Sequence, residues 1–167
     1  DLLGGVKPDD VVLGAQAYMD PYWGATLDGR GDFVAIAPMT DYTSDSTFSI
    51  SFWFRAPPSE EDRYQYMWSH GSYSYPNSLN IYLTLSGRIR TALRGADDAW
   101  SNSDLDLSAD FRDDLWHHYV LTVDSTAPMA KVYVDGALQA EAPLGAGGLN
   151  PSFHLHIGGR NDLHRMH

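Results

Sequence analysis

Residues 116–136, WHHYVLTVDSTAPMAKVYVDG, combine two runs of strand-forming residues with the turns that end them. A polar break with a proline separates the run 119–123 from the run 131–134, which is typical of two antiparallel strands and their loop. The second run ends in Asp135-Gly136, a dipeptide that favours a tight turn, and a third short run follows it. The stretch therefore predicts a β-meander.

A second stretch, residues 47–55, alternates between large apolar side chains and mostly polar ones. Because successive strand residues point to opposite faces of a sheet, this alternation predicts a strand with one buried face. The expected core face carries Phe48, Ile50, Phe52 and Phe54, and the other face carries Thr47, Ser49, Ser51, Trp53 and Arg55.

Two further alternating runs lie on either side of a central Ser-Gly dipeptide and predict a hairpin. A two-residue loop would mix apolar with charged groups on one face of this hairpin, whereas a three-residue loop, 86–88, keeps them apart. In the expected register the pairs are Leu85 with Ile89 and Ile81 with Leu93. The opposite face then carries Asn80, Tyr82, Thr84, Arg90 and Arg94.

The remaining strands are predicted from shorter runs, which lie at 11–13, on both sides of 28–32, at 64–69 and at 153–157. Residues 95–114 are polar and rich in aspartate, and we expect a long loop there, anchored by Trp100 and Phe111. No stretch of a dozen residues has helical periodicity. We therefore expect an all-β fold, an antiparallel sandwich or jelly roll.

The composition limits the classes of partner. The chain has 167 residues, which suits one domain with its own core. Its 22 acidic and 11 basic residues give a net charge of −11, which repels phosphate backbones, so no nucleic acid partner is expected. It has no cysteine, and no apolar run long enough for direct membrane insertion. The sequence does not begin with Met, and we expect it to be part of a longer polypeptide or assembly.

The succession LDGRGDFVAI, FSISFWFRA, LNIYLTLSGRI, WHHYVLTVD, AKVYVDG and FHLHIGG resembles the laminin G-like members of the concanavalin A-like lectin/glucanase superfamily, close to the pentraxin-like subgroup. The resemblance covers residues 25–160 and implies a two-sheet antiparallel jelly-roll sandwich, preceded by an extended lead-in segment of residues 1–24. In this family a last strand usually follows the Ile-Gly-Gly segment, and no such strand occurs before His167. We therefore expect the domain, residues 25–167, to lack its final strand and the native polypeptide to continue.

Resemblance to pentraxins also implies a calcium site, for which the matching positions are Asn77, Asn161 and Asp162. Calcium binds six to eight oxygens, which carboxylates, amides, carbonyls and water could supply together. Asp28 and Asp32, on either side of a Gly-Arg-Gly turn, are a second candidate pair. Their alternative role is turn formation, because Asp side chains bond to nearby backbone.

The candidates for ligand binding are Tyr73, Tyr75, Asn77, Trp100, Arg90 and Arg94. The aromatic side chains of this set fall in predicted loops, where they could stack on sugars or pack beneath the loops. The two arginines could hold an anionic sugar through forked hydrogen bonds, or they could pair with neighbouring aspartates of this acidic chain.

Two other patterns favour scaffold roles. Residues 30–32, Arg-Gly-Asp, spell an integrin-binding signal, but they fall where the family has an ordinary turn, and we expect the turn. His154 and His156 share one strand face, as zinc ligands would, yet the sequence offers no third ligand. His117 and His118 follow a tryptophan as in the family's structural pattern. We expect all four histidines to be core or surface residues.

Catalysis is not expected, because the chain lacks the motifs that it requires. Glycosidases of this fold need two carboxylates on one strand face, and no such motif contains Glu60, Glu61 or Glu141. We expect a non-catalytic, extracellular or cell-surface recognition module that binds a glycan or an extracellular protein through rim loops. The alternatives are a structural or assembly domain of a larger surface or filament protein and, third, a glycoside hydrolase.

Overall fold

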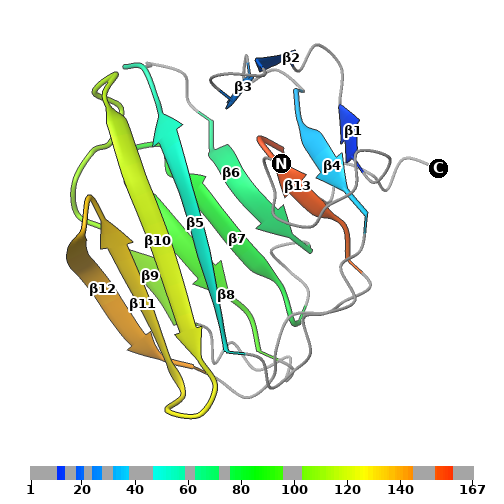
Figure 1. The fold of residues 1–167 in the computed structure, drawn as a ribbon. Coiled ribbons are helices and arrows are strands. Elements are labelled where there is room, and N and C mark those ends of the chain that lie inside the picture. Colours follow the sequence, from blue (N-terminus) through cyan, green and yellow to red (C-terminus); the bar gives the residue numbers. More distant parts are fainter. Residues whose placement is uncertain are drawn as a thin grey trace.

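A computed structural model describes residues 11–13, 18–20, 24–27, 32–37, 47–58, 63–71, 76–95, 103–144 and 153–159. These ranges contain strands, turns and loops without a helix, and none of them holds a helix that could cross a membrane (Figure 1). The strands are β1 (Val11–Leu13), β2 (Tyr18–Asp20), β3 (Gly24–Thr26), β4 (Val34–Ile36), β5 (Phe48–Arg55), β6 (Gln65–His70), β7 (Leu79–Leu83), β8 (Ile89–Leu93), β9 (Ser103–Asp106), β10 (Trp116–Asp124), β11 (Met129–Val134), β12 (Ala137–Pro143) and β13 (Leu155–Ile157).

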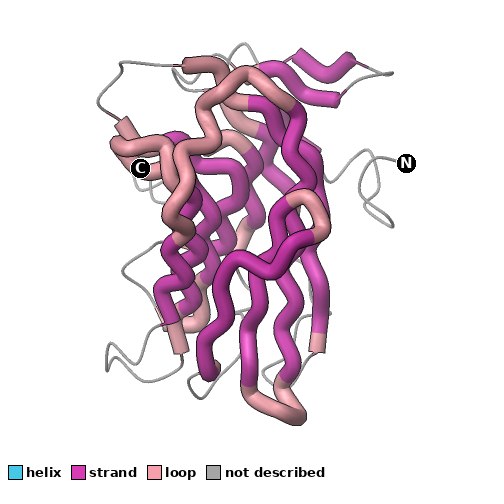
Figure 2. The backbone as a smooth tube through the Cα atoms, turned by 90° about the vertical axis from the view of Figure 1, so that its left-hand side faces the viewer, coloured by secondary structure: helices cyan, strands magenta, loops and turns pink. Residues whose placement is uncertain are grey.

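The strands form two large antiparallel sheets that lie in two layers (Figure 2). The seven-stranded sheet has the order β1-β4-β13-β6-β7-β8-β9, and the four-stranded sheet has the order β12-β11-β10-β5. A small third sheet consists of β2 and β3. The predicted all-β, two-sheet jelly-roll sandwich is confirmed, and the run at 11–13 supplies an edge strand of the larger sheet.

The predicted meander is confirmed as β10, β11 and β12. Tyr119 pairs with Val134 across the first hairpin, and β10 also pairs with β5 along its other edge. The turn between β11 and β12 has φ of 52° at Asp135 and 78° at Gly136, as a type I′ turn requires. β10 is therefore an inner strand of the four-stranded sheet, with partners on both sides.

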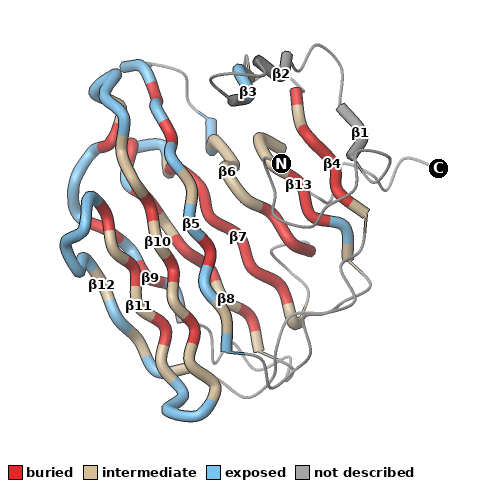
Figure 3. The backbone as a smooth tube through the Cα atoms, in the orientation of Figure 1, coloured by how far each residue is buried: buried red, intermediate tan, exposed pale blue. Residues whose placement is uncertain are grey.

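The core lies between the two layers, where the buried residues of both sheets meet (Figure 3). On β5 the predicted face is confirmed, because Ile50 and Phe54 are buried while the intervening Ser51 and Trp53 are exposed. Tyr119 of β10 has no exposed surface, and its hydroxyl forms a 2.6 Å hydrogen bond with Thr91 Oγ1 of the opposite sheet. Burial raises the pKa of Tyr119 well above its usual range.

The hairpin between β7 and β8 has the predicted loop length but not the predicted register. Leu83, not Leu85, pairs with Ile89, so the three-residue loop begins one position earlier and Leu85 is 44% exposed. The N–H of Gly87 donates to the carbonyl of Thr84, and Gly87 has φ of 73°. A three-residue loop of this kind needs a positive φ at its third residue, and Gly87 occupies that position.

The prediction of one long loop over residues 95–114 was wrong, because β9 lies within it. β9 pairs with β8, and the alternating Leu105 and Leu107 are buried in the core. The expected anchor Phe111 is buried and packs against Phe54, while Trp100 lies outside the described residues.

His117 joins two turns at one end of the four-stranded sheet. Its Nδ1 lies 2.8 Å from Asp135 Oδ2 and its Nε2 lies 3.1 Å from Asp113 Oδ1, while its ring packs against Phe54 and Phe111. Burial opposes the charged imidazolium, but the two carboxylates outweigh burial and raise the pKa of His117. The scaffold role expected for this histidine agrees with these contacts.

Gly87 and Gly136 provide a matched test of the turns. Both have positive φ, 73° and 78°, so alanine costs about 1 kcal/mol at either position. A Cβ at Gly87 would also lie 1.8 Å from Asp110 Oδ1, whereas a Cβ at Gly136 meets nothing within 4 Å. We expect Gly87→Ala to lower the free energy of unfolding by about 1 kcal/mol more than Gly136→Ala, because the carboxylate must leave Arg112. Urea denaturation measures both losses, and equal losses would contradict this account.

His117 also predicts a pH dependence of stability. Its raised pKa means that its contribution is fully present below the pKa of the unfolded chain and is lost as pH rises through the raised value. Asp113 and Asp135 have lowered pKa values, so their contributions are lost only under more acidic conditions. In urea denaturation, His117→Asn should therefore destabilise the protein more at about pH 5.5 than at about pH 8.5. The exposed His154→Asn is the control, and an equal effect of His117→Asn at both pH values would refute the role of its charge.

Candidate functional site

The outer face of the seven-stranded sheet, which points away from the four-stranded sheet, carries two rows of cross-strand neighbours. The first row is Ser69, Asn80, Ala92 and Asp104, and the second is Tyr66, Tyr82, Arg90 and Asp106. The predicted division of β7 and β8 into an apolar face and this polar face is confirmed, because the register error shifted the pairs without exchanging the faces.

Three tyrosines form an aromatic group at the second row. Tyr66 stacks on Tyr82 with ring centroids 4.9 Å apart, and Tyr64 meets Tyr82 edge-on at 5.5 Å. Tyr82 is buried, whereas Tyr64 is 50% exposed. The half-exposed Tyr64 ring thus rests against Tyr82, which Tyr66 covers in turn.

Arg90 lies beside this aromatic group and forms a forked pair with Asp106. Its Nε and Nη2 donate to the two carboxylate oxygens at 2.5 and 2.7 Å, and both side chains keep part of their surface exposed. The hydrogen bonds to Asp106 raise the pKa of Arg90 above its usual value, against the opposing effect of burial. Arg94 donates to Asp104 at 2.6 Å and is almost fully buried. Both arginines therefore pair with neighbouring aspartates, which is the second of the two roles considered for them.

Two members of the first row, Ser69 and Asn80, form a buried polar pair. Ser69 Oγ donates to Asn80 Oδ1 at 2.7 Å, and neither residue has exposed surface. His156 of β13 is the cross-strand neighbour of Ser69 on the other side of β6 and is also buried. Its ring stacks on Phe33 with centroids 5.3 Å apart. His156 is thus a core histidine and His154 is a surface histidine, which are the two roles expected for this pair.

The other predicted site residues do not gather in the described part of the chain. Asn77 lies in the connection before β7 with φ of 59°, and its N–H donates to the carbonyl of Gly95. Asp32 precedes β4 and is buried at 4% exposure, so the last residue of the Arg-Gly-Asp tripeptide is not presented at the surface. The positions that lie outside the described residues are Asp28, Arg30, Gly31, Tyr73, Tyr75, Trp100, Asn161 and Asp162.

The described residues include no group of three or more His, Asp or Glu side chains that could hold a metal ion. Asn77 and Asp32 are therefore the described members of the expected calcium sets, and each set depends on partners outside the described ranges.

Sequence reasoning missed Tyr64, Tyr66, Asp104 and Asp106 as members of this face. The Tyr-x-Tyr spacing at the start of β6 and the alternation of aspartates with Leu105 and Leu107 were the available signals, since both follow the period of a strand. The assembled face offers an aromatic ring, fixed hydrogen-bond donors and carboxylate acceptors. These are the groups that bind a hydroxyl-rich ligand.

Comparison with known proteins places the fold in a family. A sequence profile of the laminin G type, for the concanavalin A-like lectin/glucanases superfamily, matches residues 9–166. A comparison with the curated proteins gives no significant match.

Solved structures of similar fold include two of the CBM40 module of the Ruminococcus gnavus IT-sialidase. One carries no named ligand, at 21% identity over 71% of this chain and 66% of that chain, with a TM-score of 0.56. The other is bound to α2,3-sialyllactose, at 19% identity over 77% of this chain and 78% of that chain, with a TM-score of 0.57.

The botulinum neurotoxin serotype D ligand-binding domain, in complex with N-acetylneuraminic acid, is also similar. It is 15% identical, with a TM-score of 0.71, over 89% of this chain and 37% of the toxin domain. These structures agree with the two-sheet architecture, and the profile covers nearly the whole chain. The chain therefore belongs to the laminin G-type family of the concanavalin A-like lectin/glucanases superfamily.

Proposed function

We propose that the chain is a non-catalytic carbohydrate-binding module that acts outside the cell. The observation that carries this proposal is the half-exposed Tyr64, which packs against the buried Tyr82 beside the Arg90–Asp106 pair. A tyrosine ring covers the apolar face of a sugar, and fixed donors and acceptors beside it bind the hydroxyls. Binding of this kind needs no acid, base or nucleophile.

The relatives of known structure support a glycan as the ligand class. Two of those structures are complexes, one with α2,3-sialyllactose and the other with N-acetylneuraminic acid. Complex glycans are displayed on cell surfaces and in extracellular matrices, so an extracellular location goes with this proposal.

The charge of the face favours sugar hydroxyls over a sugar carboxylate. Asp106 already occupies the fork of Arg90, and Asp104 occupies Arg94, so an anionic sugar would have to displace a carboxylate from its arginine. A neutral sugar can instead form hydrogen bonds with the exposed parts of Arg90 and Asp106 without breaking their pair. We therefore place neutral glycans first among the ligands of this face.

Calcium is a further part of the proposal. The candidate ligands Asn77 and Asp32 supply amide and carboxylate oxygens, which suit calcium, and Asp28, Asn161 and Asp162 would complete the sets. A glycan interaction that is lost in EDTA and restored by calcium would support this part, and equal binding under both conditions would contradict it.

The test of the proposed function is a glycan array with neutral and sialylated glycans, followed by titration of the best ligand. Tyr64→Ala should weaken binding about tenfold or more, because the only exposed ring of the described aromatic group is removed. Leu115→Ala removes a side chain of similar exposure at another place and should leave binding unchanged. Silence on the array, or release of new reducing ends from a bound glycan, would contradict the proposal.

A further inference from the structure

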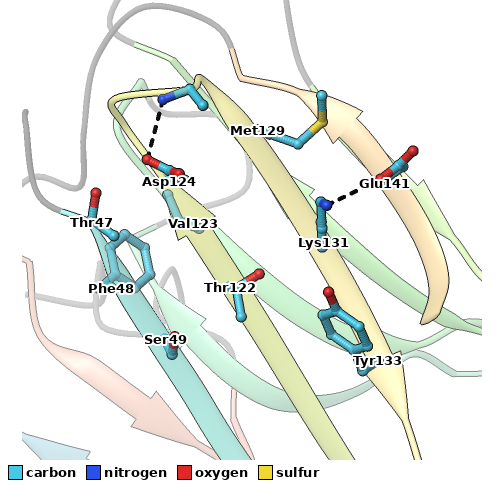
Figure 4. Close-up of a pocket in the computed structure, with 11 residues that line it drawn as sticks. Thr47, Phe48, Ser49, Thr122, Val123, Asp124, Met129, Lys131, Tyr133 and Glu141 are labelled. Carbon is cyan, nitrogen blue, oxygen red and sulfur yellow. Dashed lines mark hydrogen bonds and ion pairs between the residues drawn. The ribbon is translucent and has the colours of Figure 1, made fainter. Parts of the chain in front are cut away.

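The outer face of the four-stranded sheet contains a groove of about 540 Å³ at the end near the β10–β11 turn (Figure 4). All four strands of the sheet contribute to its lining. A volume of this size suits a small ligand or a short segment of a polymer rather than the flat surface of another domain.

A polar row crosses the floor of this groove. Its members are direct cross-strand neighbours, one from each strand, namely Ser49, Thr122, Lys131 and Glu141. Tyr133 follows Lys131 on the same face of β11. In the described part of the chain, none of these five side chains forms a hydrogen bond with the protein. Lys131 and Glu141 are an ion pair at 3.7 Å, and both side chains are about half exposed.

This row differs from the outer face of the other sheet. There, Arg90, Arg94 and Asn80 already bond to protein groups, so their hydrogen-bonding capacity is partly used. Here, hydroxyl, ammonium and carboxylate groups all keep their capacity for a ligand. The arrangement offers both donors and acceptors, which a sugar hydroxyl needs because it is itself both.

One half-buried apolar side chain, Met129, lies beside the row on the same outer face of β11. Phe48 and Val123 also border the groove, but their side chains belong to the core between the two sheets. The groove therefore combines its polar floor with the apolar surfaces of Met129 and the Tyr133 ring. A pyranose ring has the matching character, with C–H groups on its faces and hydroxyls around its edge.

Trp53 extends this surface along β5. It lies four residues beyond Ser49 on the same face, which corresponds to about 14 Å along a strand. Trp53 is 63% exposed, and one side of its ring stacks on His118 at 4.8 Å. A 2.7 Å hydrogen bond from Ser51 Oγ to His118 Nε2, in either direction, holds that histidine. The indole is thus a fixed platform with one open side.

The charges of the face favour a neutral ligand. Lys131 pairs with Glu141, and Arg55 forms a forked pair with Asp114 at 2.9 Å, so these four charges cancel. Asp124, which also lines the groove, adds a negative charge that disfavours an anionic ligand. The chain as a whole carries a net charge of −11, which repels an anionic polymer. A protein partner would need a dry apolar centre, whereas the centre of this face is the polar row.

We propose that the groove and Trp53 form a second carbohydrate-binding surface, which takes a neutral oligosaccharide on the layer opposite the first site. Lys131, Glu141 and Tyr133 bind sugar hydroxyls, and Trp53 stacks on a ring farther along the chain of sugars. This surface is separate from the Tyr64 face, so either site can exist without the other.

The test is NMR titration of the labelled chain with cellohexaose, maltohexaose and mannohexaose as probes. We expect at least one probe to shift the signals of Lys131, Tyr133 and the Trp53 indole. The double variant Lys131→Ala with Glu141→Ala preserves net charge and should weaken that binding about tenfold, as should Trp53→Ala. Two variants are controls: Tyr64→Ala lies in the first site, and Leu115→Ala lies outside it. Neither should change these shifts.

Several outcomes would overturn the second surface. Shifts confined to Tyr64 and Arg90 would support the proposed function and reject this inference. Shifts confined to the groove would support this inference and reject the Tyr64 face as a glycan site. The absence of shifts with all three probes would reject it. Dimer formation that buries Trp53, measured by sedimentation, would assign the face to protein assembly instead. Thermal unfolding of each variant separates lost binding from lost structure.

Discussion

The contact between Tyr119 and Thr91 shows the constraint on which the sandwich depends. Tyr119 lies on an inner strand of one sheet, is fully buried, and stacks on Phe52 at 5.0 Å. Its hydroxyl reaches the other sheet, where the equally buried Thr91 is its partner. A buried hydroxyl without a partner is costly, so this bond sets which faces of the two sheets meet. Every residue of opposite parity on these strands is consequently turned outward.

The two outward faces that result are chemically different. On the seven-stranded sheet, the polar groups are largely bonded to one another, as in the Ser69–Asn80 and Arg90–Asp106 pairs. On the four-stranded sheet, the side chains around Lys131 keep their hydrogen-bonding capacity and lie beside a groove. The first face is prearranged around one open tyrosine, and the second is open along its whole row.

Sequence periodicity was sufficient for the strands with one buried face. The alternation of residues 47–55 and the Asp135-Gly136 turn predicted β5 and the meander correctly, because both signals are local. The register of the β7–β8 hairpin failed, since alternation specifies faces and leaves a shift of two residues open. β9 was missed because aspartates between its leucines have the composition of a loop. Of the residues on the candidate face, the sequence singled out Arg90 and Arg94, together with their place on the polar side of the hairpin.

The sequence by itself determined the all-β class and the core-facing side of the strands with one buried face, because these follow from residue alternation and turn chemistry, and it carried the family resemblance. Only the tertiary structure decided which side chains meet across strands distant in the chain. Lys131 with Glu141, His117 with Asp113 and Asp135, and Trp53 on His118 all depend on register and on the pairing of β5 with β10. Such pairs arise from non-local hydrogen bonding between strands, and no pattern in a single strand specifies them.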